Sequence, residues 1–433
     1  MKPLSRAAII AVGTELLTPS RIDTNSLFIT EQLNLLGITV IFKSVIGDDR
    51  EDLAVAFRSA LERVDLIVFS GGLGPTDDDV TREVVSAVLR RPLTEDEALT
   101  ERLRARFVAR GFQPPMPENN RRQAMVPEGA YTIDNAFGSA PGLWIEEGER
   151  LVVLLPGPPR ELRPMLTSLV EGRLRERSPG HAIVRRVVKI SGRIESQVDE
   201  ALQPLYRAWG QMSPPIAATI LANPGQIELH VSVRASSGEA ARRALEGAAS
   251  QVIEVLGADV FSTDGRSLEE VVGVLLVERG MNIAVAESCT GGLITSRLTD
   301  VAGSSRYVLQ SVVVYSNEAK STLVGVPAEL IAEHGAVSEP VALAMAEGIR
   351  TRAGVDIGVG VTGIAGPSGG TAEKPVGTVV IAAATRSGSC SRTFRFFGER
   401  DRVKFQASQA ALDMVRRMLL GSGKVEEVEK VEK

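Results

Sequence analysis

The stretch AESCTGG holds three potential nucleophiles in a row, directly after an apolar segment and before a helical pattern. Ser288, Cys289 and Thr290 are followed by Gly291 and Gly292. Glycines let a backbone approach a ligand closely, and free amides at a helix start suit a phosphate or a developing oxyanion. The stretch therefore predicts a phosphate-binding turn or a nucleophile site, and a tight turn without chemistry is the alternative.

The helix that follows this turn is indicated by the spacing of its apolar residues. Thr290 is a residue type that caps helices, so we expect it at the N-cap. Ile294, Leu298 and Val301 are then spaced to share one helical face. Because strand–glycine–helix turns are common in α/β proteins, the stretch alone does not decide between the interpretations.

Two further polar clusters follow apolar segments in the same part of the chain. VVVYSNEAK places Tyr315, Asn317 and Lys320 after one segment, and GVGVTGIAGPSGG places Thr362 and Gly363 after another. Seen singly, Lys320 is typical of a solvated helix and Thr362 of a loop. Since a parallel sheet brings the carboxyl ends of its strands together, we expect these clusters to meet the AESCTGG turn in one site.

The composition restricts how a nucleophile in this site could be activated. The chain has three histidines, His181, His230 and His334, and none is close to another in sequence, which disfavours a histidine base. Cys289 is the stronger nucleophile, but a cysteine without a neighbouring histidine or cation is more often a buried apolar residue. A serine needs a base, and a lysine desolvated enough to be neutral is the natural candidate.

A second glycine turn occurs near the amino terminus, in FSGGLGPTDDDVTREVV. Gly71, Gly72 and Gly74 free the backbone for close approach to a phosphate, although the turn matches neither the dinucleotide fingerprint nor the P-loop. Thr14, Glu15 and Asn25, after the first apolar segment, could line the same pocket. The alternative there is a polar loop in which Asp23 or Thr24 caps the next helix.

The acidic residues after this second turn suggest a metal. Asp77, Asp78 and Asp79 would repel a phosphate unless a divalent cation bridges them, and oxygen ligands suit a hard ion such as Mg²⁺. Asp79 and Glu83 lie four residues apart, so we expect them on one helical face at the start of that helix. Capping of the helix by one or two of these acids is the alternative.

The elements that position these residues alternate along the chain as apolar strands and amphipathic helices. This pattern predicts an α/β fold in which parallel sheets are covered on both faces. We expect two parallel-sheet α/β domains, 1–174 and 260–421, joined by a small α+β domain, 175–259. The charged segment 422–433 is expected to be a disordered tail.

Composition narrows the functional classes further. A chain of 433 residues suggests two or three domains, and its net charge of −5 argues against nucleic-acid or membrane partners held by bulk electrostatics. Two cysteines cannot form a disulfide framework or a four-thiolate zinc site, which fits a reducing cytoplasm. The first apolar run meets Glu15 too soon for a signal peptide or a membrane span.

The motifs AESCTGG, YSNEAK and GVTGIAGPSGG resemble the signature of the carboxyl-terminal domain of the CinA family, the nicotinamide-nucleotide amidases. The resemblance implies that Ser288 is the nucleophile and Lys320 its general base, with Tyr315 alongside, and that no cofactor is needed. The reaction would convert nicotinamide mononucleotide into nicotinate mononucleotide and ammonia. The implied substrate-binding residues are Thr290, Gly291, Gly292, Asn317, Thr362, Gly363 and Arg402.

The amino-terminal segment resembles the molybdopterin-binding fold of the same family, through Asp79, Thr81 and Glu83 and the motif LPGPPRE. The resemblance implies metal-dependent hydrolysis of ADP-ribose to AMP and ribose 5-phosphate. A divalent metal such as Mg²⁺ would be held by Asp78, Asp79 and Glu83. The implied substrate-binding residues are Thr14, Glu15, Asn25, Gly71, Gly72, Gly74, Thr76, Thr81, Gly157 and Pro158.

The resemblance leaves two alternatives and adds one expectation about assembly. The amino-terminal domain could instead bind or adenylylate molybdopterin. The whole protein could instead be chiefly a scaffold in competence. The family also implies a homodimer, with the middle domain at its interface.

Overall fold

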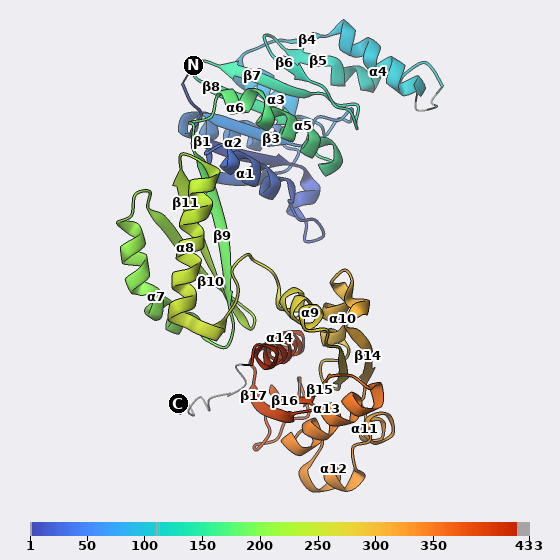
Figure 1. Ribbon diagram of the computed structural model, residues 1–433. Coiled ribbons are helices and arrows are strands. Elements are labelled where there is room, and N and C mark those ends of the chain that lie inside the picture. The colour runs from blue at the N-terminus through green and yellow to red at the C-terminus, as the bar shows by residue number, and fades with distance from the viewer. Residues whose placement is uncertain (1, 110, 112, 422–433) are drawn as a thin grey trace. The chain divides into compact units, whose positions relative to one another are not determined.

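The computed structural model of the protein is shown in Figure 1 and describes residues 2–109, 111 and 113–421. The predicted tail at 422–433 lies outside the described residues. The chain divides into two compact units, 1–184 with 233–244, and 185–232 with 245–433. No helix within the described residues is long and apolar enough to cross a membrane.

The amino-terminal sheet has six strands in the order β2-β1-β3-β8-β7-β6, of which the first four are parallel. The strands are β1 (Arg6–Val12), β2 (Thr39–Ile46), β3 (Leu66–Ser70), β6 (Tyr131–Ile133), β7 (Gly142–Glu147) and β8 (Arg150–Leu155). β6 and β7 are antiparallel to their neighbours. β7 and β8 are joined by a two-residue turn, which permits only antiparallel pairing.

Helices cover both faces of this sheet, and this explains why its central strands have apolar residues on both faces. Ala8 and Ile10 of β1 pack against Phe57, while Ala7 and Ile9 pack against Leu33 on the other face. The helices are η1 (Thr14–Leu17), α1 (Asn25–Leu35), α2 (Arg50–Arg63), α3 (Thr81–Leu89), α4 (Glu97–Ala109), η2 (Glu118–Ala124), α5 (Pro159–Glu171) and α6 (Arg173–Glu176). A small ladder joins β4 (Leu93–Glu95) to β5 (Met125–Pro127).

The middle of the chain forms a four-stranded sheet in the order β10-β11-β9-β12. Its elements are β9 (Ala182–Ile190), α7 (Glu195–Gly210), β10 (Ile216–Asn223), β11 (Gln226–Ala235), α8 (Gly238–Leu256), η3 (Gly257–Asp259) and β12 (Val260–Ser262). The sequence pattern predicts β9, α7, β11 and α8 but misses the two outer strands. β10 is largely exposed and β12 has three residues, so neither carries a long apolar pattern.

The carboxyl-terminal sheet has the order β14-β13-β15-β16-β17, with the first three strands parallel and the last two antiparallel. The strands are β13 (Ile283–Glu287), β14 (Val308–Val313), β15 (Ile357–Gly363), β16 (Thr378–Thr385) and β17 (Gly388–Arg395). The helices are α9 (Leu268–Arg279), α10 (Leu293–Asp300), η4 (Ser304–Arg306), α11 (Asn317–Val324), α12 (Ala328–His334), α13 (Glu339–Ala353) and α14 (Arg400–Leu419). The α/β class predicted from sequence is confirmed, and in both large sheets the parallel strands continue into antiparallel ones.

Two glycines of the GVGVTG motif serve the packing of this domain. A methyl group on Gly358 would lie 2.1 Å from the carbonyl oxygen of Ala346, and one on Gly360 would lie 2.4 Å from that of Ala342. Both carbonyls belong to α13, which therefore lies directly on β15. These glycines bring α13 close to the sheet and leave Thr362 at the strand's end.

Candidate active site

Ser288, at the carboxyl end of β13, lies beside Lys320, which follows the loop after β14. Ser288 directly follows β13, and its amide donates to the Val361 carbonyl of β15 at 2.9 Å, which fixes the turn to the sheet. Lys320 lies in the first turns of α11, whose N-cap residue Ser316 accepts a hydrogen bond from the Ala319 amide. The Lys320 Nζ atom lies 3.3 Å from the Ser288 Oγ atom.

Lys320 is almost completely buried, with 2% of its surface exposed, and Ser288 with 7%. Nζ also donates to the carbonyl oxygens of Val314 at 3.0 Å and Tyr315 at 3.4 Å. Among the described residues, no carboxylate forms an ion pair with this lysine. Burial therefore lowers the pKa of Lys320 from its ordinary value, because water no longer stabilises the ammonium.

Glu287, the last residue of β13, is fully buried and holds the start of the next helix. Its two carboxylate oxygens accept hydrogen bonds from the amides of Gly292, Ile294 and Thr295 at 2.9–3.1 Å, and from the Thr295 hydroxyl at 2.7 Å. A carboxylate in this position caps a helix and interacts favourably with its dipole.

This arrangement corrects the sequence prediction about the glycine turn. Thr290 does not cap the helix, because α10 begins at Leu293 after Gly292. The Gly292 amide donates to Glu287 and is not free for a ligand. Gly291 and Gly292 have φ values of 61° and 91°, so this left-handed turn requires glycine at both positions.

Cys289 and Thr290 face the interior of the domain. Burial raises the pKa of the Cys289 thiol to about 12, which keeps it protonated and unreactive at neutral pH. The Thr290 side chain is fully buried, and its hydroxyl oxygen has no hydrogen-bond partner. Both side chains therefore point away from the surface on which Gly291 is exposed.

Tyr315 and Arg400 form the rim of this site. The Arg400 guanidinium donates to the Tyr315 hydroxyl at 2.8 Å and to the Gly366 carbonyl at 2.7 Å, which ties α14 to two loops. Tyr315 is 62% exposed. The predicted Arg402 is exposed, and its methylene groups pack against Gly398.

The other residues predicted for this site have mixed environments. The Thr362 hydroxyl is buried and donates to the Ala336 carbonyl at 2.8 Å. Asn317 is exposed at the first position of α11. Gly363 lies against Thr378 of β16, where a methyl group would approach the carbonyl to 2.8 Å. Thr362 and Gly363 thus support the local backbone.

The second glycine turn, in the amino-terminal domain, is closed by its own side chains. Gly71 and Gly72 have φ values of 108° and 67°. The Thr81 hydroxyl donates to the Gly71 carbonyl at 2.9 Å, and its amide donates to the Gly72 carbonyl at 3.2 Å. Gly74 lies against the Asp79 carboxylate, 2.4 Å from where a methyl group on this glycine would be.

Asn25 joins three segments at this edge of the sheet. Its side-chain amide donates to the Ser70 hydroxyl at 2.9 Å and to the Gly157 carbonyl at 2.7 Å, while its buried Oδ1 atom has no partner. Pro158 follows as the N-cap residue of α5. The ends of β3 and β8 and the start of α1 are therefore brought together.

The predicted metal ligands are not arranged as a metal site. Asp79 precedes the first residue of α3, so it does not share a helical face with Glu83, and it accepts hydrogen bonds from Thr76. Glu83 is paired with Arg122 at 3.0 Å, and Asp78 is exposed. Within the described part of the chain no three acidic, histidine or cysteine residues could hold a metal. The donor set as placed does not fit a divalent ion.

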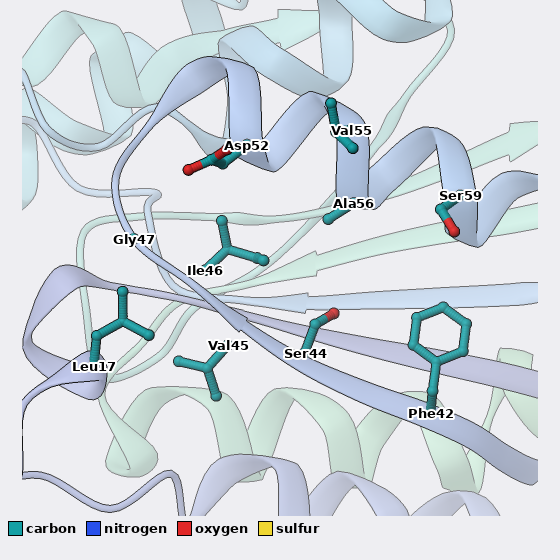
Figure 2. A pocket seen from close by; sticks show the side chains of 10 residues that line it. All are labelled: Leu17, Phe42, Ser44, Val45, Ile46, Gly47, Asp52, Val55, Ala56 and Ser59. Carbon is teal, nitrogen blue, oxygen red and sulfur yellow. The ribbon is translucent and has the colours of Figure 1, made fainter.

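Thr14 and Glu15 lie in η1, beside the end of β2. The Thr14 amide and hydroxyl exchange hydrogen bonds with Asp48, and Glu15 is exposed. A cavity of about 500 Å³ lies nearby, between β2 and α2 (Figure 2). Its lining residues are Leu17, Phe42, Ser44, Val45, Ile46, Gly47, Asp52, Val55, Ala56 and Ser59. None of the residues predicted from sequence lines it.

Sequence reasoning missed Glu287 and Arg400 in the carboxyl-terminal site and Arg122 in the amino-terminal one. An acidic residue inside an apolar strand is the signal that could have identified Glu287, because a buried charge needs partners. Arg400 stands two positions before the predicted Arg402. Arg122 carries no local signal, because its contacts to Asp77 and Glu83 span 45 and 39 residues.

Comparison with known proteins assigns each part of the chain to a described domain. The family model "CinA C-terminal domain" matches residues 265–419. The model "Probable molybdopterin binding domain" matches residues 8–176. The model "Damage-inducible protein CinA KH domain" matches residues 185–262.

Full-length relatives are similar as well. A "CinA-like protein" of Koribacter versatilis is 48% identical over 96% of this chain and 100% of its own length. One of Acidobacterium capsulatum is 47% identical over the same shares. A crystal structure of "the protein CinA with unknown function" from Thermoplasma acidophilum covers 40% of this chain and 98% of its own, with 34% identity and a TM-score of 0.37.

Proposed function

Since the chain belongs to the CinA family, whose members align with 96% of its length, we propose that its carboxyl-terminal domain hydrolyses the carboxamide of nicotinamide mononucleotide. The products are nicotinate mononucleotide and ammonia. One observation carries the proposal: the Nζ atom of buried Lys320 lies 3.3 Å from the Oγ atom of buried Ser288.

In the proposed reaction, neutral Lys320 is the general base. Two of its N–H groups donate to the carbonyls of Val314 and Tyr315, which leaves another tetrahedral position of Nζ directed at Ser288. In the neutral amine that position holds the lone pair, which accepts the Ser288 proton as Oγ attacks the carboxamide carbon. Burial makes the neutral form accessible because it lowers the pKa of Lys320.

The attack creates an oxyanion that needs hydrogen-bond donors. The amides of Gly292, Ile294 and Thr295 are already taken by Glu287, and that of Gly291 donates to the Ser288 carbonyl. We propose the amides of Cys289 and Thr290 as these donors, because they lie near the Cys289 sulfur, which is only a weak acceptor and competes little with an oxyanion. Losing one good oxyanion donor typically costs about 3 kcal/mol in the barrier.

The second half of the reaction reverses the proton transfer. As the carbon–nitrogen bond breaks, the Lys320 ammonium gives its proton to the leaving nitrogen, which departs as ammonia and leaves an ester on Ser288. A water molecule then attacks the ester with Lys320 again as base, which releases nicotinate mononucleotide and restores the serine. No step of this scheme requires a metal or cofactor.

Product identification tests this proposal. The purified protein is incubated with nicotinamide mononucleotide, and ammonia and nicotinate mononucleotide are quantified separately. We expect equimolar amounts of the two products. Release of free nicotinamide would instead mean that the glycosidic bond is cleaved, and an unchanged substrate would refute the proposal.

We further propose that the amino-terminal domain binds a nucleotide pyrophosphate, with hydrolysis of ADP-ribose as the implied reaction. The supporting observation is Asn25, whose unpartnered Oδ1 lies where the ends of β3 and β8 meet the start of α1. Ligands of open α/β sheets bind at this edge. The carboxylates of the described residues, as placed, do not form a metal site.

Incubation with ADP-ribose, with and without divalent metal, tests this second proposal. AMP and ribose 5-phosphate are its expected products. Binding or adenylylation of molybdopterin with no cleavage of ADP-ribose would favour the pterin alternative. If the purified, folded protein shows neither activity, the scaffold alternative would be favoured.

A further inference from the structure

Lys404 of α14 lies over the nucleophile turn. A methyl group placed on Gly291 would be 3.5 Å from the Lys404 Nζ atom and 3.9 Å from its Cε atom. Gly291 is exposed and is three residues after Ser288. The ammonium of Lys404 therefore lies beside Gly291, at van der Waals distance from a methyl group placed there.

The three cations in the first turns of α14 have different environments. Arg400 is engaged by the Tyr315 hydroxyl and the Gly366 carbonyl. Arg402 is turned toward Gly398. Lys404 has no hydrogen bond or ion pair with any residue that the structure describes. Of the three, Lys404 alone is both beside the nucleophile turn and uncommitted to another protein group.

The charge balance around this turn favours an anion. Glu287 is the one carboxylate within the turn, and it is fully buried and accepts hydrogen bonds from four donors, one on Gly292 and three on α10. Glu287 therefore does not neutralise the positive charge of Lys404, which is half-buried beside the exposed backbone of Gly291. An uncompensated lysine next to a glycine turn suits a phosphate, which it binds as a point charge.

We propose that Lys404 binds the phosphate of the substrate and thereby makes this site select a nucleotide over the corresponding nucleoside. The inference rests on the proposed amidase function and specifies what that site recognises. Lys404 acts on the part of the substrate remote from the carboxamide, so it contributes binding rather than proton transfer. Its removal therefore raises KM for the nucleotide and leaves kcat nearly unchanged.

Two substrates and five proteins test the proposal. Nicotinamide mononucleotide and nicotinamide riboside are compared in the wild type and in Lys404→Gln, Lys404→Arg, Arg402→Gln and Arg386→Gln. Arg386 is exposed in the turn between β16 and β17, at the opposite edge of the sheet from Ser288. Arg386→Gln removes one positive charge, as Lys404→Gln does, and therefore controls for the change in net charge. Thermal unfolding of each protein shows whether it is folded.

We expect Lys404→Gln to lower kcat/KM for the mononucleotide about ten- to a hundredfold, the usual range for a hydrogen bond to a charged group. The same variant should treat the riboside as the wild type does. Lys404→Arg should keep most of the preference because it keeps the charge. Equal losses on both substrates, or a loss confined to Arg402→Gln, would overturn the assignment of Lys404.

A binding measurement separates failure of this inference from failure of the proposed reaction. The Ser288→Ala protein and the Ser288→Ala/Lys404→Gln protein are titrated with nicotinamide mononucleotide by calorimetry. A tenfold or larger weakening by the second substitution supports the phosphate contact even if no deamidation is found. Equal affinities refute it even if the wild type deamidates the substrate.

Discussion

The two glycine turns of this chain follow buried parallel strands in the same way, but they leave different groups available for chemistry. After β13, Glu287 accepts the helix-start amides, and Lys320 remains directed at Ser288. After β3, the turn is closed by Thr81, while Asp79 is held by Thr76. Similar turns therefore become different sites, because what matters is which polar groups the surrounding protein has already satisfied.

The largest expected effect removes the nucleophile from the first turn. Ser288→Ala should lower kcat for deamidation by about four orders of magnitude or more, as in other enzymes that lose a catalytic serine. Cys289→Ala should retain most of the activity because the thiol is buried and stays protonated. Ammonia release is the measurement. Near-normal release by Ser288→Ala would show that the first turn does not supply the nucleophile and that the two turns do not differ in this respect.

Replacement of the base should separate activity from stability. Lys320→Met should abolish deamidation while the protein becomes more stable at low and neutral pH. Burial lowers the pKa of Lys320, so the folded state carries a penalty below that lowered pKa, and the penalty disappears as pH rises toward the ordinary value. Denaturant unfolding at several pH values measures this, and a gain that grows with pH would contradict the assignment.

The pH dependence of the wild type follows from the same group. Since the base must be neutral, kcat/KM should rise with pH through the lowered pKa of Lys320 and then level off. The rise should be complete below the ordinary lysine pKa. A profile that shows no rise at any pH below the ordinary lysine pKa would argue against a lysine base.

Glu287→Gln should have an intermediate effect, through the position of the nucleophile turn. Each carboxylate oxygen accepts two hydrogen bonds, so a glutamine must set its NH₂ group against N–H donors of α10. We expect kcat to fall about a hundredfold with KM little changed, and stability to fall by about 2 kcal/mol. Glu287→Asp should recover part of kcat, which loss of stability alone would not explain.

The smallest effect is expected at the second turn, where Arg122 forms ion pairs with Asp77 and Glu83. Arg122→Gln should leave deamidation unchanged and free Glu83, whose second oxygen is already without a partner. Because these acids as placed do not form a metal site, the wild type should bind Mg²⁺ weakly, and removal of the cation should tighten that binding by about fivefold or more. Calorimetric titration with MgCl₂ measures this, and unchanged affinity would mean that these acids do not bind the ion.

The sequence predicted those features that depend on local pattern. Apolar strands alternating with amphipathic helices predicted the α/β class that the structure confirms. Ser288 and Lys320 were selected because each follows a strand and parallel strand ends converge. Strands β10 and β12 were missed because β10 has a single buried residue, Ile216, and β12 has only three residues.

Tertiary structure decided the state of each polar group. That Glu287 would take the helix-start amides, or that Arg122 would pair with Glu83, depends on which distant segments meet, and composition does not encode this. The same holds for Lys404, which lies over Gly291 although 113 residues separate them in the sequence. Local sequence thus fixed the elements and the candidate residues, whereas burial and partners, which set charge and reactivity, came only from the packing of the folded chain.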